Sequence, residues 1–264
     1  MHKPQSVSIC IVTYNNADKI GDAVASISRH TKLPYTLYIS DNGSTDNTVG
    51  TVLSANPDAV ILQNGKNIGF GQAHNKVLTR LNSEYHVVVN PDISFNYDVI
   101  SEICEYLDNN PEVVLAAPKI LTPGGAEQIL PKRRPKLKYL AARRLHLSRR
   151  LADEYAMADV VLDKPTEVDF CSGCFFVIRT EIFKKLSGFD DRFFMYFEDA
   201  DLTLRTKQYG KTMFLPALTV THAWEKSSAK SLKYFFIHFG SMLKFFWKYR
   251  GKKDTINENC YHRK

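Results

Sequence analysis

Residues 7–12 read VSICIV, an uninterrupted apolar run. A strand that is apolar at every position is typical of a parallel sheet with helices on both faces. A helical pattern follows, with Ile20, Val24 and Ile27 on one side, and Asn16 stands where it can cap the start. The beginning of the chain therefore predicts a strand followed by a helix, the unit of an α/β fold.

The same alternation continues through the first 120 residues. Further strands are expected over 35–40, 59–63, 85–90 and 113–118, and helices over 45–54, from about 71 to 82, and over 99–107. Short connections between alternating strands and helices favour a mostly parallel, doubly wound sheet. Ligands bind at the carboxyl ends of the strands in such sheets, so the loops after the strands are the first candidates for a site.

The second half of the chain is less regular. Short strands are expected over 167–170, 175–179, 212–215 and 218–222, and helices over 181–186, 198–209 and 231–250. The last helix carries many aromatic and basic residues, so the expected fold is an α/β domain followed by amphipathic helical structure.

Polar residues stand where the predicted strands end. Asp41 opens the loop DNGSTD, and Asn90-Pro91-Asp92 follows an apolar strand. A carboxylate at this edge can bind a base, a ribose or a divalent cation that carries a diphosphate, but turns also favour Asp and Asn. Neither a GxGxxG fingerprint nor a Walker A sequence is present.

Residues 193–210, FFMYFEDADLTLRTKQYG, place three acids directly after a group of aromatics. Carboxylates beside apolar surface indicate a pocket with a base or a cation. Acids are also favoured at a helix N-terminus, which is the alternative interpretation. Asp201 and Arg205 form an i,i+4 pair in the favourable order, so Asp201 is expected to be structural.

Charge is concentrated in one segment. The net charge is +7, and residues 131–150 hold nine basic residues and no acid, so the rest of the chain carries −2. A local basic segment indicates a polyanionic partner, either nucleic acid or an anionic membrane. The five cysteines are scattered, and the single pair Cys171 and Cys174 is expected to lie in the core rather than bind zinc.

Several segments together resemble family 2 glycosyltransferases of the GT-A fold. They are VSICIVTYNN, DNGSTDNT, NIGFGQAHN, VVVNPD, SGCFFVIRTEIF, GFDDRFFMYFEDADLTLR and TVTHAW. They occur in the order of the family and span about residues 7–224. Within the family, the sequence is most similar to bacterial rhamnosyltransferases of O-antigen and lipopolysaccharide synthesis. That group moves L-rhamnose from dTDP-β-L-rhamnose to GlcNAc-diphospho-undecaprenol.

The resemblance implies a donor site along the strand ends. It assigns nucleotide or donor binding to Thr13, Tyr14, Asn15, Asp41, Asn67, Gly69 and Asn90. Asn90 and Asp92 occupy the family's Asp-x-Asp position, which holds Mg²⁺ or Mn²⁺ and the donor diphosphate. Because Asn replaces the first Asp here, Asp92 is expected to be the main ligand and the metal affinity to be lower. His222 matches a late histidine that reaches the metal or the diphosphate, although a lone histidine can also be structural.

The resemblance further implies that Asp199, in the Glu198–Asp199 pair, is the catalytic base, and Glu198 is expected to act beside it in the catalytic site by orienting the acceptor or the base. A carboxylate with a raised pKa is suited to take the proton of an acceptor hydroxyl, and the preceding aromatics can supply the desolvation. One base without a second carboxylate nucleophile implies a single displacement with inversion. A β-linked rhamnose donor then gives an α-linked product.

Two basic segments are expected to hold the enzyme at a membrane. Residues 132–150 interleave basic and apolar residues, and 231–250 combine aromatics with Lys and Arg, as in interfacial helices. The apolar stretches are too short to span a bilayer, and no signal peptide is evident. We expect a cytoplasmic protein, peripheral on the inner face of the bacterial inner membrane. Core packing is the alternative for the C-terminal aromatics.

The expected organisation is a catalytic domain over 1–225 and a membrane-associating helix and tail over 226–264. The domain divides into a nucleotide-sugar half (1–120), a basic amphipathic insertion (131–152) and an acceptor and catalytic half (165–225). Another donor such as a UDP- or GDP-sugar, or another acceptor, is the first alternative function. A nucleic-acid-binding protein and a regulator that has lost catalysis are less favoured, because they leave the strand-end residues or Asp199 without a role.

Overall fold

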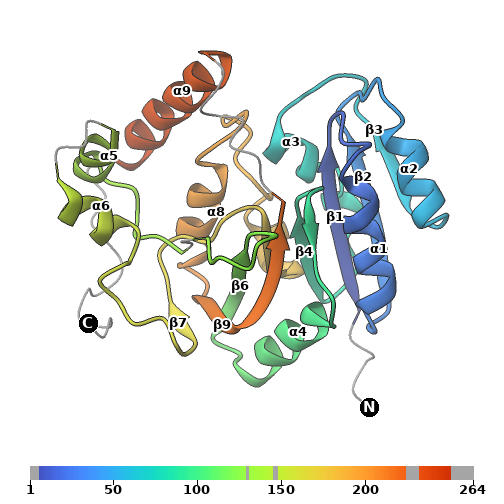
Figure 1. Ribbon diagram of the computed structural model, residues 1–264, viewed down its shortest axis with the longest axis horizontal. Coiled ribbons are helices and arrows are strands. Elements are labelled where there is room, and N and C mark those ends of the chain that lie inside the picture. Colours follow the sequence, from blue (N-terminus) through green and yellow to red (C-terminus); the bar gives the residue numbers. More distant parts are fainter. Residues whose placement is uncertain (1–5, 129–130, 145–147, 224–231, 251–264) are drawn as a thin grey trace.

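The computed structural model describes residues 6–128, 131–144, 148–223 and 232–250. Strands and helices alternate through the first part of the chain, as the sequence predicts. The elements are β1 (Val7–Thr13), α1 (Ile20–His30), β2 (Tyr35–Asp41), α2 (Thr48–Ala55), β3 (Val60–Gln63), α3 (Phe70–Asn75), a 3₁₀ turn (Leu78–Arg80) and β4 (Tyr85–Val89). All four strands pair in parallel, in the order β3-β2-β1-β4. This part is the doubly wound half of the sheet (Figure 1).

The rest of the chain completes the same sheet in a mixed arrangement. Its elements are β5 (Ile93–Ser94), α4 (Val99–Asn109), β6 (Val113–Leu121), α5 (Leu137–Arg144), α6 (Arg149–Tyr155), β7 (Thr166–Glu167), β8 (Phe175–Arg179), α7 (Thr180–Lys185), α8 (Glu198–Thr206), β9 (Lys211–His222) and α9 (Leu232–Tyr249). The strand order is β3-β2-β1-β4-β8-β6-β9-β5, and β7 pairs with β9. β8 runs antiparallel to both β4 and β6. Only the first half of the sheet is therefore purely parallel.

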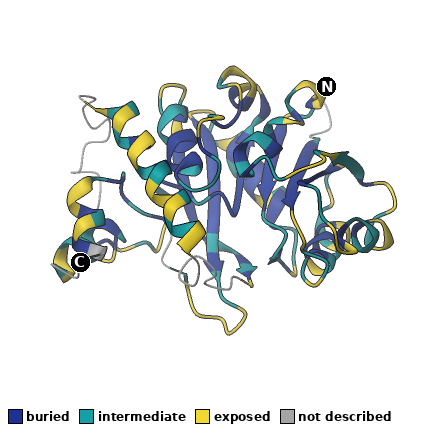
Figure 2. Ribbon diagram, turned by 90° about the horizontal axis from the view of Figure 1, so that it is seen from above, coloured by how far each residue is buried: buried dark blue, intermediate teal, exposed yellow. Residues whose placement is uncertain are grey.

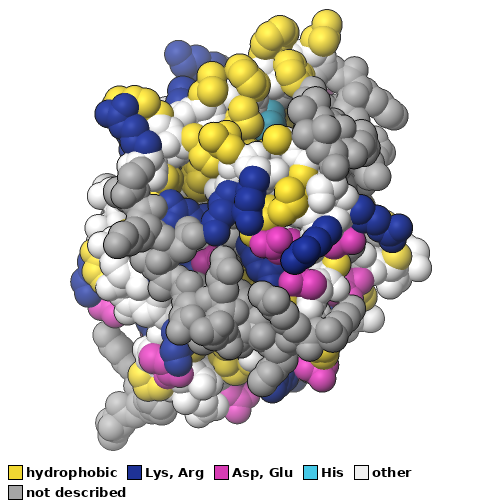
Figure 3. Space-filling view, turned by 90° about the vertical axis from the view of Figure 1, so that its left-hand side faces the viewer, with side chains coloured by type: hydrophobic (Ala, Val, Ile, Leu, Met, Phe, Trp, Pro, Cys, Tyr) yellow, Lys and Arg dark blue, Asp and Glu magenta, His cyan; other side chains and the backbone are white. Residues whose placement is uncertain are grey.

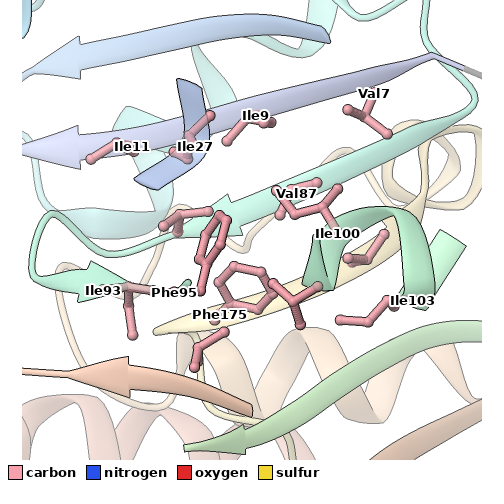
Figure 4. Packing of buried hydrophobic residues seen from close by; sticks show 14 of the residues in the cluster. Val7, Ile9, Ile11, Ile27, Val87, Ile93, Phe95, Ile100, Ile103 and Phe175 are labelled. Carbon is pink, nitrogen blue, oxygen red and sulfur yellow. The ribbon is translucent and has the colours of Figure 1, made fainter. Parts of the chain in front are cut away.

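Both faces of the sheet are covered by packed side chains. Val7, Ile9 and Ile11 of β1 belong to one buried cluster, together with residues of α1 and α4. Cys10, between them, belongs to a second cluster with residues of α7 and β8. Successive residues of a strand point to opposite faces, so the apolar run of β1 is explained by burial on both sides. Figure 4 shows the first cluster, and Figure 2 shows the buried strands between helices with exposed outer sides.

Three local expectations need correction. Asn16 does not cap a helix with its side chain, because its Oδ1 accepts hydrogen bonds from Thr13 Oγ1 and the Tyr14 N–H, and α1 starts at Ile20. α2 starts at Thr48 rather than at residue 45, since the Asp46 carboxylate accepts the Thr48 N–H in a turn. The two strands expected over 212–222 form the single strand β9, whose pairing with β6 shifts register after Pro118.

The basic segment also differs from a single amphipathic helix. It forms the two short helices α5 and α6, which contact each other. Arg133 is buried and its guanidinium pairs with Asp159, while Tyr139 stacks on Tyr155 with ring centroids 5.5 Å apart. Part of the basic charge is therefore used inside the fold.

The cysteines and the last helix follow the sequence expectations in part. The four cysteines in the described ranges are buried free thiols, as expected for core residues, and burial raises the pKa of each. Helix α9 is formed as predicted, and one side of it packs on the protein, with Ser241 and Phe245 buried. Trp224, which is suited to stacking on a sugar or to core packing, lies outside the described residues, as do 226–231 and 251–264 of the expected membrane-associating segment.

Candidate active site

The strand-end residues predicted from the sequence meet at one edge of the sheet. The register places Thr13 of β1 opposite Asp41 of β2, and Ile11 of β1 opposite Val89 of β4. Because the strands are parallel, the loops that follow them all leave from this edge. Thr13, Asp41 and Asn90 are thereby brought together from three separate strand–loop junctions.

The first two loops are tied to each other by hydrogen bonds. Asn15 has a left-handed backbone (φ 54°), its N–H donates to Ser44 Oγ, and its Oδ1 accepts the Thr45 N–H. The buried Asp41 accepts hydrogen bonds from the N–H and the hydroxyl of Ser44. Asp41 therefore shapes this loop, while Tyr14 is 46% exposed and available to a ligand.

A third loop connects this edge to the segment that carries the acids. Asn67 Oδ1 accepts the Gly69 N–H, and Gly69 has a φ of 91°. The next residue, Phe70, donates its N–H to the carbonyl of Phe194 at 2.8 Å. A Cβ on Gly69 would lie 2.3 Å from that carbonyl oxygen, so glycine is required both by φ and by the close approach.

Asn42 is a structural residue of this edge that the sequence pattern did not reveal. It is buried, its side-chain N–H donates to the Gly69 carbonyl, and its Oδ1 accepts from Asn64 and from the Ile68 N–H. It therefore fixes the Asn67–Gly69 loop to the end of β2. Its position directly after Asp41 was the available signal.

Asp92 and His222 lie together, although 130 positions separate them. The short strand β5 pairs with the end of β9, with Ile93 opposite His222, and the Ala223 N–H donates to the Asp92 carbonyl. The His222 Nε2 lies 3.2 Å from an Asp92 carboxylate oxygen. Asp92 lies in a turn, as the sequence alternative allowed, because the Ile93 N–H donates to the Asn90 carbonyl. It does not cap α4, whose N-cap is Asp98.

Gln128 holds the His222 ring in this position. Its Oε1 lies 3.3 Å from His222 Nδ1, and its side-chain N–H donates to the His222 carbonyl. A second group that bonds the far nitrogen of a histidine is the usual way to orient a metal-binding imidazole. Gln128 was missed in the sequence because it stands in an irregular segment with no motif.

These residues fit a divalent cation as a partial ligand set. Two neighbouring ligands of an octahedral ion with bonds of about 2.1 Å lie about 3.0 Å apart, close to the separation of the two ligand atoms here. Among the described residues, no cluster of three or more His, Cys, Asp or Glu that could hold a metal is formed. A protein site of one or two ligands is typical of Mg²⁺ or Mn²⁺ that also binds substrate phosphates.

The Glu198–Asp199 pair stands at the start of α8, where Glu198 is buried and Asp199 is partly buried. The N–H groups of Gly173 and Ala200 donate to the Asp199 carboxylate at 3.1 and 2.8 Å. Burial raises the pKa of Asp199, against the opposing effect of these N–H groups and of the Lys132 charge. Burial, and then the neighbouring Asp199, raise the pKa of Glu198 well above its usual range.

The two acids therefore differ in charge. One Glu198 oxygen is buried without a hydrogen-bond partner in the described part of the chain. Backbone N–H donors stabilise an ionised carboxylate, and Asp199 has them. The proton of the pair therefore resides on Glu198, and Asp199 is the carboxylate.

The β4–β8 pairing brings the two predicted sites together. The Asn90 N–H donates to the carbonyl of Cys174, and the preceding Gly173 N–H donates to Asp199. Burial raises the pKa of the Cys174 thiol to about 12, and the charges of Asp92 and Asp199 contribute to this shift. The candidate metal pair and the candidate base therefore both lie close to Cys174.

The backbone before the acid pair is strained. Tyr196 and Phe197 both have left-handed conformations, with φ of 69° and 68°. Such conformations in large non-glycine residues cost free energy and persist where the surroundings enforce them. Here α9 contacts this turn, because Ser241 donates to the Met195 carbonyl and the His238 ring packs on both aromatic rings.

Asp201 is structural, as the sequence predicts. It is fully buried, accepts a hydrogen bond from Arg205 Nε at 2.7 Å and pairs with Lys248 of α9. The Tyr249 hydroxyl donates to it at 2.8 Å. The third acid of the cluster therefore attaches α9 to α8.

Comparisons with known proteins identify a family and relatives of similar sequence. The family model for "Glycosyl transferase family 2" matches residues 8–187. The chain is 26% identical over 232 residues to N-acetylglucosaminyl-diphospho-decaprenol L-rhamnosyltransferase of Mycobacterium tuberculosis. This match covers 81% of this chain and 75% of the relative. The chain is 32% identical over 99 residues to rhamnosyltransferase WbbL of Escherichia coli K12, 37% of this chain and 36% of the relative.

Solved structures share the fold at low sequence identity. The mannosyltransferase PcManGT of Pyrobaculum calidifontis, in complex with GDP-Man and Mn²⁺, has a TM-score of 0.60 and 17% identity. The match covers 92% of this chain and 65% of that protein. Staphylococcus aureus TarS with UDP has a TM-score of 0.60 and 16% identity over 97% of this chain and 68% of its own. The α/β fold expected from the motifs is confirmed, and this chain belongs to glycosyl transferase family 2.

Proposed function

We propose that this protein is an inverting rhamnosyltransferase. It transfers L-rhamnose from dTDP-β-L-rhamnose to a GlcNAc residue linked to a lipid diphosphate, in O-antigen or lipopolysaccharide synthesis. The named activity of the mycobacterial relative supports the sugar and the acceptor class. The observation that carries the proposal is the Asp199 carboxylate, which accepts hydrogen bonds from two backbone N–H groups close to Cys174, and Asp92, which pairs with His222, also lies close to that cysteine.

The chemistry is a single displacement. The acceptor hydroxyl oxygen attacks C1 of the donor sugar and its proton moves to the Asp199 carboxylate. The bond between C1 and the diphosphate oxygen breaks, and the nucleoside diphosphate leaves with the electron pair. Attack from the face opposite the leaving group inverts C1, so a β-linked donor gives an α-linked product. Glu198 keeps its proton and so leaves Asp199 as the only negative charge of the pair.

The donor site is formed by the strand-end loops. We assign donor contacts to Thr13, Tyr14, Asn15, Asp41, Asn67, Gly69 and Asn90, which line or shape that edge. Asp92 and His222 would hold Mg²⁺ or Mn²⁺, and this cation would neutralise the charge of the departing diphosphate. The mannosyltransferase that shares this fold binds its nucleotide sugar together with Mn²⁺, which supports this choice of ion.

The acceptor defines where the enzyme acts. A sugar on a polyprenyl diphosphate is fixed at the membrane, so we propose that the protein binds peripherally to the inner face of the bacterial inner membrane. The basic and aromatic segments 132–150 and 231–250 supply charge and apolar side chains for an anionic lipid surface. The described part of the chain contains no helix long and apolar enough to cross a membrane.

The direct test is a transfer assay with a donor screen. Purified protein, Mn²⁺ and a GlcNAc-diphospholipid are incubated with dTDP-rhamnose, UDP-sugars or GDP-sugars, and the glycolipid product is measured. We expect rhamnosyl-lipid from dTDP-rhamnose. If product forms only with a UDP-sugar or a GDP-sugar, the donor is not dTDP-rhamnose. These two donor classes are tested because the solved structures of similar fold contain UDP or GDP-Man.

The base is tested by Asp199→Asn, which keeps the shape and removes the proton acceptor. We expect kcat to fall about 10²–10⁴-fold. Asp153→Asn, at a 53% exposed carboxylate in α6, is the matched control and is expected to retain activity. For the wild type, kcat/KM should fall with decreasing pH through a value above the ordinary Asp range, since the base must be unprotonated and its pKa is raised. Wild-type turnover by Asp199→Asn contradicts the assignment.

A further inference from the structure

Helix α9 has two faces of opposite character. Its inner face is fixed to the protein by the burial of Ser241 and Phe245 and by the bonds of Lys248 and Tyr249 to Asp201. For this face, the C-terminal aromatic residues therefore pack on the protein, which was the alternative to membrane binding in the sequence analysis. With the inner face fixed, the direction of the outer face is fixed as well.

The outer face is an exposed apolar stripe. Its members are three or four residues apart, which places them on one side of a helix. They are Leu232 (79% exposed), Phe236 (66%), Phe239 (45%), Leu243 (53%) and Trp247 (61%). Figure 3 shows hydrophobic side chains gathered on the upper part of the face where α9 lies, with Lys and Arg side chains beside them. Contiguous exposed apolar surface of this kind marks an interaction site.

The charged side chains of α9 itself are of one sign. Helix α9 contains no Asp or Glu, and exposed Lys233, Lys244 and Arg250 stand beside or at the end of the stripe. The Arg250 guanidinium lies 4.8 Å from the centre of the Trp247 ring. Aromatic and aliphatic side chains with flanking cations are the composition of a helix that lies in the headgroup region of an anionic bilayer.

We propose that this outer stripe of α9 is the surface by which the protein docks on an anionic lipid bilayer, with the helix in the plane of the interface. The inference deepens the proposed function, on which its purpose depends. The opposite side of α9 contacts Tyr196 and Phe197, directly before the Glu198–Asp199 pair. Docking by this face therefore places α9 between the lipid surface and the turn that directly precedes the catalytic acids.

The basic segment 131–150 has a secondary part in this docking. Among its described residues, Arg133 forms a buried ion pair with Asp159, and the exposed Lys138 and Arg149 lie beside Glu154 and Asp153. Paired cations contribute less to the attraction of an anionic surface. We therefore assign most of the binding to the bilayer, and all of its apolar part, to α9.

The test compares two double variants that change charge equally. Phe236→Glu with Trp247→Glu alters the stripe, and Leu53→Glu with Tyr209→Glu alters exposed apolar side chains outside α9, which are 39% and 42% exposed. Binding is measured by cosedimentation with phosphatidylcholine vesicles that contain phosphatidylglycerol. Because both variants add two negative charges, a difference between them reports the stripe alone. Circular dichroism checks that both remain folded.

We expect wild-type protein and the Leu53/Tyr209 variant to bind, and the Phe236/Trp247 variant to lose at least about tenfold in partitioning. Equal vesicle binding by the two variants overturns the proposal, as does a wild type that does not bind. A lipid-free dimer that only the stripe variant disrupts also overturns it, in favour of a second copy of the chain as the occupant.

A water-soluble GlcNAc-diphosphate with a short alkyl chain separates this inference from the proposed function. The stripe variant should still glycosylate that acceptor, because its catalytic residues are unchanged. Vesicle binding by a wild type that transfers no sugar refutes the proposed function and leaves the docking surface in place. Full transfer without vesicle binding refutes the docking surface only.

Discussion

At the scale of single residues, hydrogen bonds separate two adjacent acids. Glu198 is buried and Asp199 is partly buried, and the N–H groups of Gly173 and Ala200 donate to Asp199. A buried carboxyl group without donors keeps its proton, and one with donors loses it more readily. The sequence shows two equivalent carboxylates, and the loop before β8 makes them different.

The protonated state of Glu198 has a measurable effect on stability. Its pKa in the folded protein is raised, so the folded state holds a proton that the unfolded chain releases. Wild-type stability should therefore fall as pH rises above the ordinary Glu pKa, by at most about 1.4 kcal/mol per pH unit. Glu198→Gln has no such proton to release. Its free energy of unfolding should therefore increase relative to that of the wild type as the pH rises from about 5 to about 8.

Urea unfolding at several pH values measures this difference. Glu181→Gln in α7 is the matched control, because the Glu181 side chain is 66% exposed. A trend of equal size in the control, or none in Glu198→Gln, contradicts a protonated Glu198.

Gln128 gives a second prediction at this scale. Gln128→Ala removes the group that orients His222 and leaves both proposed metal ligands, Asp92 and His222, unchanged in sequence. Loss of such an orienting partner weakens metal binding by about 10-fold to 100-fold. Titration of Mn²⁺ in the presence of dTDP, followed by electron paramagnetic resonance, should show this weaker affinity. Gln208→Ala in the loop after α8 serves as control, and unchanged Mn²⁺ affinity in Gln128→Ala contradicts the orienting role.

At the scale of elements, the site depends on contacts between loops that follow different strands. The Asn67–Gly69 loop contacts the turn before α8, and β5 contacts the end of β9. The first contact places Phe194 beside the start of α3, and the second places Asp92 beside His222. The first contact is made by loops and the second by a strand of only two residues, so short segments position both parts of the site.

Gly69 tests the first contact. Gly69→Ala adds a Cβ 2.3 Å from the Phe194 carbonyl oxygen and strains a φ of 91°. Gly65→Ala strains a similar φ of 69° but meets nothing within 4 Å. We expect Gly65→Ala to cost about 1 kcal/mol of stability, and Gly69→Ala to cost more and to lower activity, since the turn before the acids must move. Thermal unfolding and transfer assays compare the two, and equal effects contradict a role for the close approach.

At the scale of the whole molecule, one sheet joins the donor edge and the acid pair. β8 lies between β4 and β6, so strands from both halves of the chain are hydrogen-bonded neighbours. A third buried cluster joins Phe193 and Phe197 to Phe245 of α9. Helix α9 is thus part of the folded unit through its inner face.

Cooperative unfolding tests this arrangement. The two tryptophans of the chain, Trp224 and Trp247, stand near its C-terminal end. Because α9 is attached through the buried Asp201, urea transitions followed by tryptophan fluorescence and by far-ultraviolet circular dichroism should coincide. Lys248→Met removes the ion pair with Asp201 and should lower the urea midpoint of the fluorescence transition more than that of the dichroism transition. A wild-type fluorescence transition at lower urea than the dichroism transition contradicts a docked α9.

Much of the fold was predictable from the chain alone. The apolar run of β1 and the alternation up to residue 121 predicted the parallel half of the sheet, because strands buried on both faces have a distinct composition. The polar residues after β1, β2 and β4 predicted the edge where they meet, since the ends of parallel strands lie together. The Asp201–Arg205 pair followed from helical spacing, which is a local property.

Tertiary structure decided what the sequence left open. The β5–β9 pairing brings Asp92 to His222, and the Gly173 loop donates a hydrogen bond to Asp199. The packing of Phe245 divides α9 into a buried and an exposed face. The physical reason is the range of the interactions. Apolar patterning and helix pairs depend on neighbours within a few residues, whereas the charge of a buried acid and the facing of a helix depend on residues tens of positions away.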